Sequence, residues 1–219
     1  IYTLNRDKKD GLAMDCGGKM TVFIEYIGSN TKLVIFGGGH VSLAIAKAAN
    51  FINYHVTIVE NRKEFATSDR FPFVENIICE EDFENAIEQL DIDSETYIVM
   101  VTGSFDEIIL RKIISSEAAY IGMLGSRRKV ATIINNLKKD DFPKSKLDAL
   151  YAPIGLDLGT ESCEEIAISI ISEIMMIHSG KSGTQMKRKK EGVIVVRGGG
   201  DLATGTIYRL HQSGFQVVV

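Results

Sequence analysis

LVIFGGGHVSLAIAKAA, the sequence of residues 33–49, carries the strongest indication of the fold. It joins an apolar run, a turn of three glycines and a segment whose apolar residues recur at helical spacing. A strand, a glycine turn and a helix in this order open the nucleotide-binding half of a Rossmann-type domain. A glycine motif of this kind is weak evidence on its own, so the flanking sequence has to support it.

The sequence on both sides of this stretch alternates between strands and helices. Strands are predicted at residues 32–36, 55–60, 96–101 and 120–123. Helices are predicted at residues 41–51, 82–90, 105–115, 127–139 and 162–178. This alternation predicts an α/β fold with a Rossmann-like, doubly wound parallel sheet.

The chain of 219 residues is long enough for one such domain and additional pieces. We interpret residues 1–30 as the end of a preceding domain, with a strand at 20–26, and residues 31–178 as the Rossmann-like domain. Residues 179–191 carry glycine, serine and a basic run without an apolar face, so we predict a linker there.

The glycine pattern occurs a second time near the end of the chain. VRGGGDLATGTI (196–207) lines up with IFGGGHVSLAIA (35–46), and each segment follows an apolar run. We interpret residues 192–219 as the incomplete βαβ start of a second Rossmann-like unit. A unit of this size cannot bury a core alone, so it either docks on the first domain or is the stub of a second one.

Composition and charge argue against several classes of function. The formal net charge is -4, so no global basic surface predicts binding to nucleic acid. The apolar runs are too short to cross a bilayer, so no membrane partner is expected. Cys16, Cys79 and Cys163 are widely spaced, which fits neither a disulfide framework nor a zinc site and favours a cytoplasmic protein.

The first glycine loop is a candidate cofactor-binding site. Gly37 and Gly38 form the turn, Gly39 lets the backbone approach a pyrophosphate, and Ser42 replaces the usual third glycine. His40 lies in the same loop, where it can face a ligand. Uncapped N–H groups at a helix start attract anions. The alternative is a glycine turn that only packs the helix against the strand.

Glu60 ends the strand that follows this helix, about twenty residues after the glycines. An acidic residue at this position binds a ribose hydroxyl in the dinucleotide-binding fold, so Glu60 is a candidate cofactor ligand. It favours a 2′-OH over a 2′-phosphate, although Arg62 weakens that choice. The alternative is a strand that simply ends in a charged residue.

A second candidate binding segment follows the strand at 120–123. Gly125 and Ser126 form a turn and a helix cap, and Arg127, Arg128 and Lys129 begin the helix. Cations at a helix N-terminus oppose the helix dipole, so an anionic ligand at this edge of the sheet would explain them. The alternative is a solvated basic patch.

The cysteines differ in their predicted environments. Glycines flank Cys16, which suggests an exposed thiol able to carry sulfur or contact a soft metal centre; the alternative is a small residue in a turn. Cys79 is expected in the strand core, and Cys163 in the first turn of a helix. No spacing indicates a metal site. The loop at 152–159 either covers a ligand or is a plain connection.

Several of these segments in one order resemble the XdhC/CoxI family of accessory factors for xanthine-dehydrogenase-type molybdenum hydroxylases. The similar stretches are MDCGGKMTVFIE (14–25), LVIFGGGHVSLAIAKAA (33–49), VTIVENRKEFATSDRFP (56–72), YIGMLGSRRKVATI (120–133) and APIGLDLGTESCEEIAISIISEI (152–174). The final stretch, VIVVRGGGDLATGTIYRLHQSGFQVVV (193–219), resembles the opening of YqeB-type proteins of selenium-dependent molybdenum hydroxylase systems.

The resemblance implies a maturation factor. It implies that the protein binds molybdenum cofactor (molybdopterin), helps a cysteine desulfurase to supply its sulfur, and delivers it to an apo molybdenum hydroxylase, with Cys16 at the family's cysteine. A homodimer is also expected. Two positions depart from the family pattern: residues 101–106 lack its histidine, and Tyr151 replaces another, which puts acid–base chemistry in doubt. The alternatives are an NAD(P)-dependent oxidoreductase and a non-catalytic nucleotide sensor.

Overall fold

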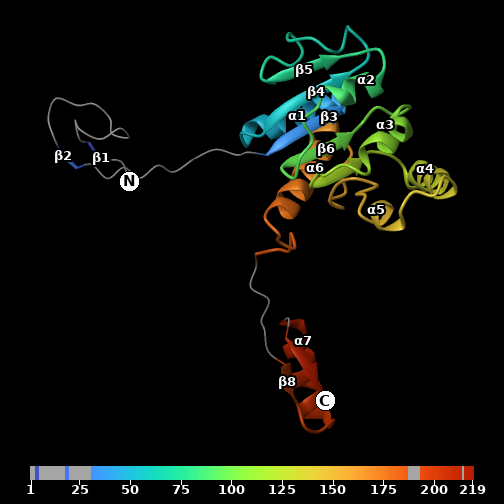
Figure 1. The fold of residues 1–219 in the computed structure, drawn as a ribbon. Coiled ribbons are helices and arrows are strands. Elements are labelled where there is room, and N and C mark those ends of the chain that lie inside the picture. Colours follow the sequence, from blue (N-terminus) through green and yellow to red (C-terminus); the bar gives the residue numbers. More distant parts are fainter. Residues whose placement is uncertain (1–2, 5–17, 20–30, 187–192, 214) are drawn as a thin grey trace. The chain divides into compact units, whose positions relative to one another are not determined.

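The computed structural model describes residues 3–4, 18–19, 31–186, 193–213 and 215–219 (Figure 1). Contacts divide the chain into two compact units, Ile1–His178 and Ser179–Val219, and each is described by itself. Cys16 and the strand predicted at 20–26 lie outside the described residues. Strands β1 (Thr3–Leu4) and β2 (Gly18–Lys19) form a short antiparallel pair.

A five-stranded parallel sheet forms the centre of the first unit. Its strands are β3 (Lys32–Phe36), β4 (His55–Glu60), β5 (Asn76–Cys79), β6 (Thr96–Met100) and β7 (Tyr120–Met123). Their order in the sheet is β5-β4-β3-β6-β7. The chain therefore moves outward from β3 to β5 on one side and then crosses back to β6 and β7 on the other. All five residues of β6 are buried, as expected for a central strand that is covered on both faces.

Helices cover both faces of the sheet (Figure 1). Helices α1 (His40–Phe51) and α6 (Cys163–His178) pack on one face, where their side chains form an apolar core with Leu33, Ile35 and Ile58. The other face is covered by α2 (Phe83–Glu88), α3 (Asp106–Ile113), α4 (Arg127–Lys139) and α5 (Lys144–Asp148). This arrangement confirms the predicted α/β, Rossmann-like doubly wound sheet.

The predicted elements agree with the structure to within two residues at most ends. Ser162 and Glu165 exchange the hydrogen bonds of a capping box at the start of α6. The sequence pattern gave no bounds for β5, although Cys79 was expected in a strand, and it missed α5. β5 is a four-residue edge strand with exposed ends, and α5 has one turn, so neither carries enough periodic apolar residues to be recognised.

The second unit is a βαβ element. β8 (Val193–Val195) and β9 (Gln216–Val218) are parallel, and α7 (Asp201–Gln212) joins them. The loop before α7 repeats the backbone of the first glycine loop: φ is +110° at both Gly37 and Gly198. Across the described residues, every helix is too short or too polar to span a lipid bilayer.

Candidate functional site

The glycine loop begins at the carboxyl end of β3, where the sheet order reverses. Gly37 donates its N–H to Val59 of β4 at 2.8 Å. A Cβ at Gly37 would lie 3.0 Å from the carbonyl oxygen of Val101, just beyond β6, and its φ of +110° strains any other residue. The loop therefore packs closely against the ends of both neighbours of β3, which are β4 and β6. The chain order reverses between β3 and β6, and this is the switch point at which doubly wound sheets bind ligands.

Gly39 faces open space at the start of α1. A Cβ built there meets no atom within 4 Å. Gly39 is the N-cap of the helix, and no side chain caps the first N–H groups. Ser42 is buried in the first turn, and its hydroxyl has no hydrogen-bond partner in the described structure. The loop thus offers free donors and room for an anionic group.

The carboxylate of Glu60 is fully engaged by protein donors. Its Oε2 accepts the N–H of Gly38 at 2.5 Å and Nη2 of Arg62 at 2.8 Å. Its Oε1 accepts the N–H groups of Asn61 at 2.9 Å and Arg62 at 3.0 Å, and Nε of Arg62 at 3.0 Å. The Glu60 side chain is only 1% exposed. Glu60 therefore holds the glycine loop and the chain after β4 together.

Burial alone would raise the pKa of Glu60. The hydrogen bonds that Arg62 and the backbone donate outweigh that effect, so the pKa lies below its ordinary value. Glu60 is ionised at neutral pH, and Arg62 compensates its charge.

Two arginines and a phenylalanine support this corner. The guanidinium of Arg62 lies 4.0 Å from the ring centroid of Phe65, and that of Arg70 lies 5.2 Å from it. Arg70 donates Nε to the carbonyl oxygen of Gly38 at 2.8 Å. Gly38 is therefore held on both sides, by Glu60 at its N–H and by Arg70 at its carbonyl. Both Phe65 and Arg70 lie in the stretch 56–72 that resembles the family, but the sequence pattern predicted a role for neither of them.

The basic segment lies at the same edge of the sheet but is only partly free. Ser126 caps α4 by accepting the N–H of Lys129 at 3.2 Å. The Lys129 ammonium is bonded to Asp106, which is fully buried at the start of α3. Arg127 and Arg128 are exposed, and we find no ion pair for either among the described residues. Of the three predicted anion-binding cations, Lys129 thus has a structural role, which the sequence pattern could not show.

Ser126 borders a shallow cavity of about 390 Å³. It is lined by Gly103, Ser104, Asp106, Glu107, Ser126, Arg128, Lys129, Thr132 and Ile133. These residues come from the chain segments after β6 and β7. The two candidate binding segments therefore both lie at the carboxyl edge of the sheet.

The loop at 152–159 is fixed to α6 by polar side chains. Glu173 is 8% exposed, and its Oε2 accepts the Tyr120 hydroxyl at 2.5 Å and the N–H of Gly155 at 3.0 Å. Ser169 donates its hydroxyl to the carbonyl oxygen of Leu156 at 2.6 Å. Burial, reinforced by Glu173, raises the pKa of Tyr120. The loop is therefore anchored rather than a loose connection.

The structure corrects the expectation for Cys79. It is exposed at the end of β5, not buried in the strand core, because β5 is the edge strand of the sheet that the structure describes. Cys163 is half-buried in the first turn of α6. Together with His40 it lines a groove between α1 and α6. Cys16 lies outside the described residues.

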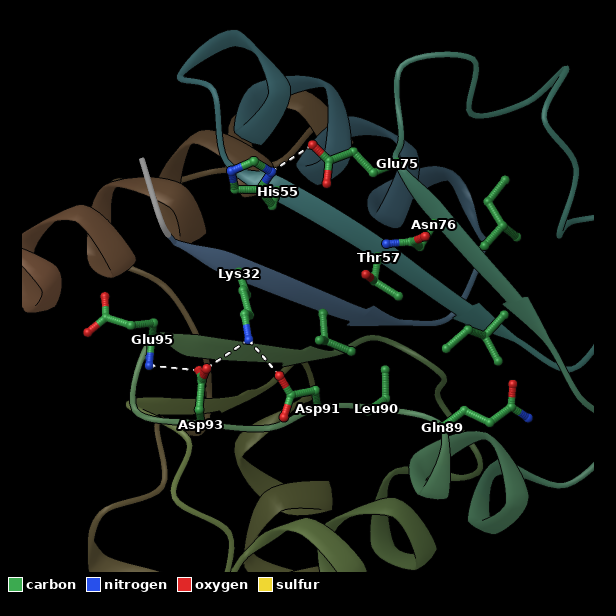
Figure 2. A pocket seen from close by; sticks show the side chains of 13 residues that line it. Lys32, His55, Thr57, Glu75, Asn76, Gln89, Leu90, Asp91, Asp93 and Glu95 are labelled. Carbon is green, nitrogen blue, oxygen red and sulfur yellow. Dashed lines mark hydrogen bonds and ion pairs between the residues drawn. The ribbon is translucent and has the colours of Figure 1, made fainter. Parts of the chain in front are cut away.

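A cavity of about 800 Å³ lies at the opposite, amino edge of the sheet (Figure 2). Five of its charged or titratable side chains are paired with one another: Lys32 bonds Asp91 at 3.0 Å and Asp93 at 2.7 Å, and His55 bonds Glu75 at 2.6 Å. Hydrogen bonds from Lys32 and Thr96 lower the pKa of Asp93 to about 2. These pairs join the strand starts. We therefore place the candidate site at the carboxyl edge, where doubly wound sheets bind ligands.

No group of three or more His, Cys, Asp or Glu side chains in the described part of the chain could hold a metal ion. The structure also gives two histidines partners that the sequence did not suggest. His55 bonds Glu75, and His178 lies 3.0 Å from the Tyr97 hydroxyl.

The fold and the glycine loop define a Rossmann-like, doubly wound α/β domain. The family model of the XdhC Rossmann domain matches residues 33–174, so the chain belongs to this family.

Two curated relatives are similar over long stretches. The chain is 33% identical over 218 residues to the uncharacterized protein YqeB of Escherichia coli (strain K12), covering 98% of the chain and 40% of that protein. It is 27% identical over 156 residues to a probable xanthine dehydrogenase subunit of Bacillus subtilis (strain 168), covering 70% of the chain and 45% of that protein.

A solved structure of a xanthine dehydrogenase from Bacillus halodurans has the same fold, with a TM-score of 0.60 and 27% identity. The alignment covers 68% of this chain and 44% of that chain. The chain thus spans less than half the length of the relatives that it matches. It is an XdhC-type domain related to xanthine-dehydrogenase-associated proteins.

Proposed function

We propose that this protein is a maturation factor for a xanthine-dehydrogenase-type molybdenum hydroxylase, and that it binds a phosphate-bearing cofactor at the carboxyl edge of its sheet. The observation that carries the proposal is the open space at Gly39 beside an uncapped helix start, at the switch point of the sheet. The names of two relatives, which mention xanthine dehydrogenase, support the choice of partner.

The residues at this edge fit a phosphate or pyrophosphate group. Gly39 leaves room for it, no side chain caps the first N–H groups of α1, and Ser42 has a buried hydroxyl without a partner in the described structure. Arg127 and Arg128 supply exposed positive charge after β7. Molybdenum cofactor (molybdopterin) and NAD(P) both carry such a group, and either one fits these donors.

Identification of the bound cofactor tests the proposal. The 219-residue chain would be purified gently and its small molecules analysed by mass spectrometry and absorbance. Molybdopterin is the expected result. Bound NAD(P) with turnover of a substrate would instead favour the oxidoreductase, and bound NAD(P) without turnover the nucleotide sensor.

Sulfur delivery and the protein partners belong to the same proposal. We propose that the chain acts in the cytoplasm with a cysteine desulfurase and an apo-hydroxylase, selenium-dependent types included, and that Cys16 carries sulfur or contacts the cofactor. Cys16→Ser should melt like the wild type and fail to activate a co-expressed hydroxylase. Cys163→Ser is the control and should activate it normally, because serine also suits a helix start. Full activation by Cys16→Ser would remove the sulfur-carrier role.

A homodimer is the last part of the proposal, and the face of α1 and α6 fits it. Phe51 is 85% exposed there and Ile168 is 55% exposed. Between the helices lies a groove of about 490 Å³, with Lys47 on α1 and Glu164 on α6. A twofold axis can pair Lys47 of one copy with Glu164 of the other. Lys47→Glu and Glu164→Lys should each weaken the dimer, and the double variant should restore it in analytical ultracentrifugation.

A further inference from the structure

The residues at the carboxyl end of β4 bear on which ligand can bind in the crevice at the carboxyl edge of the sheet, where the candidate site lies. In the dinucleotide-binding fold an acidic side chain at this place accepts the hydroxyl groups of a ribose. Here Glu60 occupies the position, but its two oxygens already accept five hydrogen bonds from the protein. A carboxylate has about four lone-pair sites, so none is left for a ligand hydroxyl.

Arg62 is the group that covers this carboxylate. It binds Glu60 through Nε and Nη2, at 3.0 and 2.8 Å, and its guanidinium lies over the Phe65 ring. The Arg62 side chain is 49% exposed, whereas that of Glu60 is 1% exposed. A ligand that reaches the end of β4 therefore meets the outer edge of a guanidinium rather than a carboxylate.

The arrangement also holds Arg62 in place. A bidentate pair with a buried carboxylate and a stack on an aromatic ring both restrict the side chain. A ribose diol could reach Glu60 only by displacing Arg62 and breaking two charge-assisted hydrogen bonds to a buried charge. A phosphate needs no displacement, because the outward N–H groups of Arg62 can donate to it directly.

We propose that Arg62 makes the crevice selective for a ligand with a second anionic group beside the end of β4, such as a 2′-phosphate, over one with a free ribose diol. This inference rests on the proposed binding of a phosphate-bearing cofactor at the glycine loop. Within that function it assigns Arg62, rather than Glu60, as the residue that contacts the ligand here. Glu60 is a positioning residue that orients Arg62 and the Gly38 N–H.

NADP+ and NAD+ test the inference, because they differ only in the 2′-phosphate. Calorimetry on the full chain should give about tenfold or more tighter binding of NADP+, the size expected for a charge-assisted contact. The difference should shrink at high salt. Arg62→Ala exposes the Glu60 carboxylate, so it should invert the preference towards NAD+. Lys63→Ala, which removes a neighbouring exposed cation with no hydrogen bond to Glu60, should keep the wild-type preference.

A second variant keeps the test informative if Arg62→Ala is unstable. If Arg62→Ala melts far below the wild type, Glu60→Gln/Arg62→Gln removes both charges together and should bind the two nucleotides equally. Equal binding by the wild type, or tighter binding of NAD+, would overturn the inference and leave the proposed function standing. Binding of neither nucleotide at millimolar concentration would overturn the inference as well, and molybdopterin in the purified protein would then be the remaining support for the maturation role.

Discussion

Gly37 and Gly39 stand two residues apart in the loop, but their surroundings differ. Gly37 has a φ of +110° and packs against Val101, whereas a Cβ at Gly39 meets nothing within 4 Å. Glycine is required at Gly37 by the backbone itself. At Gly39 the structure leaves open space, so a side chain there would meet no other part of the described protein.

The two positions can be separated with one side chain. Gly39→Val is expected to fold, with a cost of at most about 1 kcal/mol at the helix cap, and to lose cofactor binding. Gly37→Val should instead destabilise the domain by about 1–3 kcal/mol or more, because φ is strained and Val101 must move. Thermal unfolding and calorimetry measure both effects. Equal cofactor affinity in Gly39→Val and the wild type would refute the loop as a binding site.

Glu60 should make the free energy of unfolding of the domain depend on pH in the acid range. Its pKa is lower in the folded protein than the ordinary value of 4.5. Its contribution is therefore complete above about pH 4.5 and is lost as the pH falls through the folded-state value. The free energy of unfolding should differ most between the wild type and Glu60→Gln at neutral pH, and the difference should shrink in acid. A difference that stays constant from about pH 7 to about pH 3 would contradict this.

At the scale of the elements, α6 covers the sheet and also holds the loop at 152–159 in place. Ser169 and Glu173 hold Leu156 and Gly155 of the loop at 152–159, and a Cβ at Gly155 would lie 2.6 Å from the Ser169 hydroxyl. The helix thus fixes a loop at the edge where the glycine loop lies. The same Glu173 carboxylate accepts the Tyr120 hydroxyl from β7.

Removing this acceptor should loosen the loop. Glu173→Leu leaves the buried Tyr120 hydroxyl without an acceptor, at a cost of about 1–3 kcal/mol, and it also removes the acceptor of the half-buried Gly155 N–H. Hydrogen exchange at residues 154–158 should become faster. Glu173→Gln keeps an acceptor oxygen and should lose much less stability, and Ser172→Ala on the same helix is the neutral control. Unchanged exchange in Glu173→Leu would show that the loop is held by other contacts.

At the scale of the whole molecule, the two buried cores of the first unit are built, among the described residues, from residues between Leu33 and Ile177. The βαβ element of the second unit leaves Val195 and Tyr208 each 66% exposed. Gly198 repeats the φ of Gly37, but a Cβ there meets nothing, because no described strand beside β8 supplies the neighbour that Val101 provides in the first unit. The repeated loop alone therefore does not make a second crevice.

Truncation tests how far the first unit depends on the rest. A chain lacking residues 181–219 should stay folded, with a melting temperature within about 2–4 °C of the full chain, since this corresponds to about 1 kcal/mol. The isolated segment 192–219 should be unfolded by circular dichroism, because so short a unit buries too little apolar surface. A much larger fall in melting temperature on truncation would mean that the second unit stabilises the first.

The sequence alone predicted three features: the order of most strands and helices along the chain, the parallel sheet and the position of the glycine loop. These features follow from local periodicity, glycine backbone freedom and capping residues, all of which are visible within short windows. The short elements β5 and α5 gave too little local signal.

Which polar groups are free to meet a ligand emerged only from the packed structure. Lys129 is paired with Asp106, 23 positions away, and Glu60 is bonded to Gly38, 22 positions away. Cys79 is exposed because β5 is an edge strand among the strands that the structure describes. Partners that are distant in sequence are set by packing of whole elements, so a residue type and its spacing show a chemical capacity but not whether another side chain already uses it.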